Sequence, residues 1–71
     1  MKVKIVYHLN DIDGSTRKEE IVENLVEAKE KVQEALKNGV DGVRISEDDE
    51  IFEGYYPPHS IIRVDYRQIE V

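Results

Sequence analysis

The sequence contains no cysteine and no tryptophan, and it has only two prolines and four glycines in 71 residues. Without cysteine, disulfide bonds and cysteine-based zinc sites are excluded. No stretch approaches the roughly 20 apolar residues of a transmembrane helix. The apolar fraction is 39% and the charged fraction is 37%, which is enough for one thin hydrophobic core. We therefore expect one small domain over residues 1–71.

The charge balance is acidic, with 16 Asp and Glu residues against 10 Lys and Arg residues and a net charge of -6. Attraction to nucleic acid or to anionic lipid needs a basic surface, so we expect neither direct nucleic-acid binding nor membrane binding. Residues 1–6 alternate instead of forming the apolar run of a signal peptide. The expected location is therefore the cytoplasm.

Residues 2–9 alternate between apolar and polar side chains, which predicts a half-buried strand. Four side chains share its apolar face: Val3, Ile5, Tyr7 and Leu9. Asp13-Gly14 is a strong signal for a two-residue hairpin turn. This turn predicts a second strand from about Ser15 to Glu23. A longer loop from Asn10 to Ser15 would shift the pairing.

A turn at residues 13–14 also fixes which residues face each other across the hairpin. The count predicts four opposed pairs: Ile5 with Val22, Val6 with Ile21, Lys4 with Glu23, and His8 with Glu19. Two of these pairs are apolar and two pair a basic or imidazole side chain with a carboxylate, which supports the predicted register.

A helix is predicted from the next segment. Asn24 is a favoured N-cap, with Glu27 three residues later, and Gly39 is suited to end the helix. At helical spacing, five side chains form an apolar stripe: Leu25, Ala28, Val32, Ala35 and Leu36.

The remaining residues predict strands. Val43-Arg44-Ile45 and Ile51-Phe52-Glu53 form a hairpin around Asp48-Asp49, with Ile45 opposite Phe52. Pro57-Pro58 interrupts the strand pairing, and residues 62–67 form a last strand. The predicted fold is α+β, in the order β-β-α-β-β-β. It has a mainly antiparallel sheet of four or five strands, with one helix packed across one face.

The strand of residues 5–10 is followed by Asp11-Ile12-Asp13-Gly14-Ser15, which resembles the Asp-x-Asp-Gly-Ser/Thr opening of haloacid-dehalogenase-type phosphatases. The resemblance implies Asp11 as nucleophile and Asp13 as general acid/base beside magnesium. The chain is far shorter than that fold, and a hairpin turn accounts for the Asp-Gly pair. We therefore do not expect phosphatase activity.

Other chemistry-bearing residues give no better case for an enzyme. The two imidazoles, His8 and His59, have no spacing that brings them together. Glu47-Asp48-Asp49-Glu50 is typical of a solvated hairpin tip, because four adjacent carboxylates splay apart. We expect no cofactor, no metal and no catalytic activity.

Two groups of residues are candidates for binding a partner. In Tyr55-Tyr56-Pro57-Pro58-His59, strand alternation sends the two tyrosines to opposite faces, so one is exposed or at an interface. The segment is either a docking surface or a structural corner. On the sheet face away from the helix, three apolar residues predict a patch: Val6, Ile21 and Ile61. Alternatively, the tail around Ile69 and Val71 covers them.

The sequence thus favours a small, cofactor-free protein–protein interaction module that binds a protein partner or a second copy of itself as a homodimer. The expected partner-binding residues are Val6, Ile21, Ile61, Tyr55, Tyr56 and His59. The alternative is an acidic inhibitor that occupies the nucleic-acid-binding surface of another protein.

Overall fold

The computed structural model of the protein describes residues 1–12, 14–45 and 47–69. In chain order its elements are β1 (Lys2–Asp11), β2 (Gly14–Val22), α1 (Leu25–Asn38), β3 (Val40–Ile45), β4 (Ile51–Tyr56), the short 3-10 helix η1 (Pro58–Ser60) and β5 (Ile61–Ile69). The α+β class with one helix is confirmed. The predicted order β-β-α-β-β-β agrees only roughly with the structure, because the unpredicted η1 lies between the last two strands.

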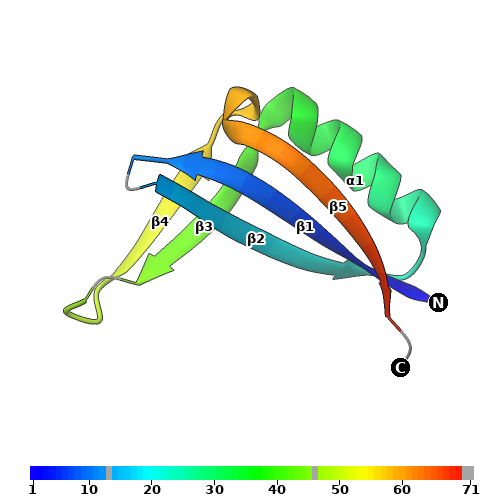
Figure 1. Cartoon of the computed structure of the whole chain (residues 1–71), viewed down its shortest axis with the longest axis horizontal. Coiled ribbons are helices and arrows are strands. Elements are labelled where there is room, and N and C mark those ends of the chain that lie inside the picture. The colour runs from blue at the N-terminus through cyan, green and yellow to red at the C-terminus, as the bar shows by residue number, and fades with distance from the viewer. Residues whose placement is uncertain (13, 46, 70–71) are drawn as a thin grey trace.

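The expected antiparallel strands are present and number five within the described residues, but they are divided between two sheets instead of forming one. β1 lies between β2 and β5 in a three-stranded sheet, and β3 pairs only with β4. All of these pairings are antiparallel. Figure 1 shows the three-stranded sheet with α1 along one side and the β3–β4 hairpin extending away from it.

The β1–β2 register differs from the prediction by two residues. Asp11 pairs with Gly14, so Val6 lies opposite Glu19 and Lys4 opposite Ile21. Because side chains alternate with a period of two, a shift of two leaves every side chain on its predicted face. The predicted turn residue Asp13 lies outside the described residues.

The hydrophobic core lies between α1 and one face of the three-stranded sheet. Its buried residues are Val3, Ile5, Tyr7, Leu9, Val22, Ala28, Val32, Ala35 and Val40. The four residues from β1 are those that the alternation predicts. Small alanines on the inner side of α1 allow the helix backbone to approach the sheet closely.

Local capping fixes both ends of α1, as predicted. The Asn24 side chain accepts a hydrogen bond of 2.9 Å from the backbone N–H of Glu27, and the Glu27 carboxylate accepts one of 3.2 Å from the backbone N–H of Glu23. Gly39 follows the helix with φ 85°. The predicted stripe is buried only at its centre, because Leu25 and Leu36 at its ends are exposed. No helix in the described part of the chain is long and apolar enough to span a membrane.

The β3–β4 register is also different from the prediction, by one residue. Ile45 pairs with Ile51, and Arg44 pairs with Phe52. The strands end at Ile45 and resume at Ile51, so the connection is longer than the predicted two-residue turn. The acidic side chains of residues 47–50 in this connection are exposed to solvent.

Candidate interaction surfaces

The β3–β4 hairpin carries large apolar side chains that no other part of the described chain covers. Val43 is 70% exposed, Ile51 71%, Phe52 50% and Tyr55 59%. By register Val43, Ile51 and Tyr55 lie on one face of the hairpin and Phe52 lies on the other. A two-stranded hairpin is only marginally stable by itself in water, and several exposed apolar side chains on one face mark an interaction site. Sequence reasoning selected only Tyr55 from this group. The others were missed because these two strands were expected to belong to the main sheet and to bury one face against the helix.

The base of the hairpin is held by its two adjacent tyrosines. The Tyr55 hydroxyl donates a hydrogen bond to the Asn38 carbonyl at the end of α1. The Tyr56 hydroxyl donates one of 2.7 Å to the Asp11 carboxylate at the end of β1. Tyr56 is partly buried against the core and Tyr55 is exposed. The prediction that one tyrosine turns inward and one outward is confirmed.

Gly42 is the position where the hairpin backbone approaches the Tyr56 ring. A Cβ atom at residue 42 would lie 2.6 Å from Cε2 of Tyr56, whereas one at Gly54 would meet nothing closer than 4.0 Å. The absence of a side chain at Gly42 therefore allows Tyr56 to cross β3 and reach Asp11.

Replacing Gly42 with alanine is expected to displace the Tyr56 ring and lower the free energy of unfolding by about 1–3 kcal/mol, the usual cost of overpacking. Gly54→Ala in the paired strand is the matched control and is expected to change stability by less than about 1 kcal/mol. Urea unfolding of both variants checks this. Equal losses in the two variants would show that Tyr56 does not depend on the space at Gly42.

The proline pair forms a structural corner between the hairpin and β5. Pro57 has φ -65° and precedes η1, and the backbone N–H of Ser60 donates a hydrogen bond of 2.9 Å to the Pro57 carbonyl. His59 lies exposed within η1 and does not begin the last strand, which starts at Ile61. The sequence left two interpretations of residues 55–59 open, a structural corner and a docking surface. The structure shows the corner. Because His59 is exposed, its role in docking a partner stays a prediction.

A cleft of about 620 Å³ separates the hairpin from the edge of the three-stranded sheet. Arg17 and Lys18 of β2 line one wall, and Asp41 and Glu53 line the other. Leu9 and Tyr56 are among the apolar residues that line it. The cleft leaves part of the hairpin open to solvent on the side that faces its own sheet.

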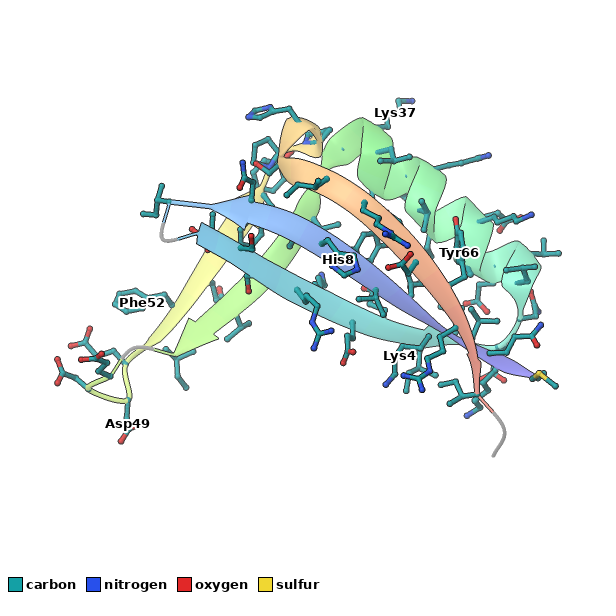
Figure 2. The ribbon with its side chains drawn as sticks, in the orientation of Figure 1. Lys4, His8, Lys37, Asp49, Phe52 and Tyr66 are labelled. Atoms are coloured by element: carbon teal, nitrogen blue, oxygen red, sulfur yellow. The ribbon has the colours of Figure 1, made fainter. Side chains whose placement is uncertain are left out.

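The second surface is the face of the three-stranded sheet opposite α1, called here the open sheet face. By register it consists of Lys2, Lys4, Val6, His8, Arg17, Glu19, Ile21, Arg63, Asp65, Arg67 and Ile69. These residues include five of the ten basic residues but only two of the fourteen acidic residues that the structure describes. Lys4 and His8, labelled in Figure 2, both project from β1 on this face. The acidic chain therefore has one basic face.

His8 is tied to Asp65 rather than to the predicted Glu19. Its Nε2 lies 2.8 Å from the Asp65 carboxylate, which also accepts a hydrogen bond of 2.9 Å from Nε of Arg63. Hydrogen bonds from His8 and then Arg63 lower the pKa of the Asp65 carboxyl below its ordinary value. Asp65 lies on β5, and the sequence alone did not predict that β5 pairs with β1.

The predicted ion pair between Lys4 and Glu23 is also absent from the structure, because each of these residues has a different partner. Lys4 lies 4.0 Å from the Glu19 carboxylate, and Lys2 lies 3.9 Å from that of Glu23, which had been assigned to Lys4. Both changes follow from the two-residue shift in the β1–β2 register. All four side chains are partly exposed, so each pair contributes little to stability.

The structure brings together only two members of the predicted apolar patch. Val6 and Ile21 are diagonal neighbours on the open sheet face, where Ile21 is 59% exposed. Ile61 is not on that face, because it pairs with Leu9 and packs against the core. A bulge beside His8 and Leu9 changes the β5 register and leaves Ile62 exposed. Ile69 lies on the open sheet face itself, and Val71 is outside the described residues.

The residues considered for catalysis have structural roles where they are described. Asp11 accepts hydrogen bonds from the Tyr56 hydroxyl and from the backbone N–H of Ile12, while Asp13 lies outside the described residues. Among the residues that the structure describes, no three His, Asp or Glu side chains gather as a metal site.

Comparison with protein-family models, curated protein sequences and solved structures finds no match to this chain. The fold and the two surfaces are therefore the basis for the functional proposal.

Proposed function

We propose that this protein is a cofactor-free protein–protein interaction module that binds its partner through the β3–β4 hairpin. The observation that carries the proposal is the exposure of Ile51, Phe52 and Val43 on a hairpin outside the core. Burying such side chains is worth about 1.5–3 kcal/mol each. The proposal retains a cytoplasmic location as a prediction.

The two anchored tyrosines support this role, because they hold the base of the hairpin while its outer half extends into solvent. Tyr55 connects the hairpin to the end of α1, and Tyr56 connects it to the end of β1. A binding element with a fixed base loses less conformational entropy on binding than a free loop does. The predicted partner-binding role of Tyr55 is kept, whereas Tyr56 acts through its anchoring contacts.

Removing the apolar side chains from the outer half of the hairpin is expected to abolish partner binding. The double variant Ile51→Thr/Phe52→Thr keeps residues that favour strands but removes the exposed apolar surface. Loss of such central contacts reduces affinity by about 30-fold or more, which corresponds to about 2 kcal/mol. The measurement is affinity capture from an extract of the source cells, with circular dichroism to verify the fold.

The matched control is Val26→Gln/Leu36→Gln, which removes two exposed apolar residues from α1. Proteins held by the wild type and by this control, but lost by the hairpin variant, would support the proposal. Equal retention by all three proteins, or equal loss from both variants, would contradict it.

A second candidate, the acidic inhibitor of a nucleic-acid-binding protein, is favoured by the separation of charge. Of the fourteen acidic residues that the structure describes, twelve lie outside the open sheet face. A complex held by those charges would weaken steeply as salt screens them, whereas an apolar contact would persist. Washing the captured complex at low and high salt separates the two candidates.

A further inference from the structure

We infer that a second copy of this chain is a partner of the module, with the hairpin of one copy seated on the open sheet face of the other. This inference rests on the proposed function and names its partner. It follows from the charges and apolar residues of the two surfaces, which are complementary, and from the dimensions of the two elements.

The open sheet face combines two neighbouring apolar residues with five basic and two acidic ones. Val6 and Ile21 are the apolar pair, and Glu19 and Asp65 flank Val6 in its cross-strand row. The rows on either side carry positive charge: Lys4 lies beside Arg67, and His8 lies between Arg17 and Arg63. Like charges in one row repel each other. Two carboxylates offset part of this repulsion: Asp65 contacts His8 and Arg63, and Glu19 lies 4.0 Å from Lys4.

Two arginines on this face remain available to a partner. Within the described part of the chain, neither Arg17 nor Arg67 forms a salt bridge. They lie on the two outer strands, at opposite edges of the face. A partner with an apolar centre and carboxylates would satisfy both arginines and cover Ile21.

The hairpin has that combination of groups. By register Val43 and Ile51 lie on the same hairpin face, where they supply exposed apolar surface, and Glu47, Asp48 and Asp49 at the tip are exposed acidic residues. Each hairpin strand has six residues, or about 20 Å at the usual rise of a strand. β5 has nine residues, about 30 Å by the same rise, so the face is long enough to hold the hairpin.

The hairpin does not use its own open sheet face in this structure. Glu47, Asp48 and Asp49 form no salt bridge with Arg17 or Arg67 within the described residues. The cleft lies between the hairpin and the β2 edge of its own sheet. Both surfaces therefore remain open for the complementary surface of another copy.

The experiment uses reversed charges and sedimentation of the full chain over micromolar to millimolar concentrations. The face variant is Arg17→Glu/Arg67→Glu, and the tip variant is Glu47→Lys/Asp48→Lys. Each variant alone opposes like charges, so its self-association is expected to be at least ten-fold weaker than that of the wild type. An equimolar mixture pairs opposite charges at both contacts and is expected to restore the association.

The control Lys29→Glu/Lys37→Glu has the net charge of the face variant but changes only exposed residues of α1. It should associate like the wild type, and its circular dichroism should match that of both test variants. Association that is unchanged in both test variants, or not restored in the mixture, would overturn the inference.

A wild type that stays monomeric at low salt would also overturn the inference, but the capture comparison would still test the proposed function with another partner. Binding of a short single-stranded DNA by the monomeric wild type, lost in the face variant, would assign the open sheet face to nucleic acid instead of a second copy.

Discussion

Replacing Ile5 with alanine is expected to lower the free energy of unfolding by about 2–5 kcal/mol, the cost of removing a large buried side chain. Ile5 is 0% exposed and lies on the central strand, facing α1. A chain of 71 residues has a total stability of about 4–11 kcal/mol. This single truncation therefore removes a large share of the stability, and urea unfolding measures it.

Ile21→Ala is the matched control, because it makes the same change on the other face of the same sheet. Ile21 is 59% exposed, so its truncation creates no cavity and is expected to cost at most about 1 kcal/mol through strand propensity. Similar losses for Ile5→Ala and Ile21→Ala would show that both faces are covered. The open sheet face would then not be open.

The second large effect is a loss of stability at alkaline pH that depends on Tyr7. Burial, with smaller contributions from Glu20 and Tyr66, raises the pKa of Tyr7 from 10.0 to about 12. The unfolded state therefore loses the phenol proton at lower pH than the native state does. The stabilisation is fully present below pH 10 and is lost as the pH rises toward 12.

A pKa difference of this size corresponds to about 3 kcal/mol at most. Tyr7→Phe lacks the ionisable hydroxyl group. Its free energy of unfolding should therefore fall less than that of the wild type between pH 9 and pH 11.5. Lysine deprotonation affects both proteins alike. An equal alkaline loss in the wild type and in Tyr7→Phe would show that the native environment does not hold the Tyr7 proton.

The helix and the buried face of β1 were predictable because their determinants are local. Asn24, Glu27 and Gly39 act within a turn of the helix ends, and the alternation in β1 depends on adjacent residues. Both hairpin registers were predicted wrongly, because register depends on the length of the connecting loop. An Asp-Gly pair does not decide between a turn at residues 13–14 and the observed pairing of Asp11 with Gly14.

The open sheet face could not be identified as basic from the sequence. Its charges come from alternate positions on three strands, so they never form a run. Arg63 lies beside His8 because β5 pairs with β1, although these two strands stand at opposite ends of the sequence. Ile61 was assigned to the wrong face because the bulge after η1 has no sequence signal that we recognised. The separation of the hairpin from the main sheet likewise depends on contacts distant in sequence.

Capture by the wild type and by Ile51→Thr/Phe52→Thr tests the central claim most directly, because only the hairpin surface differs. We expect the wild type to retain a protein partner, or further copies of itself, and the hairpin variant to lose it while remaining folded. Retention of the same partner by the folded hairpin variant would contradict the claim that this module binds through its hairpin.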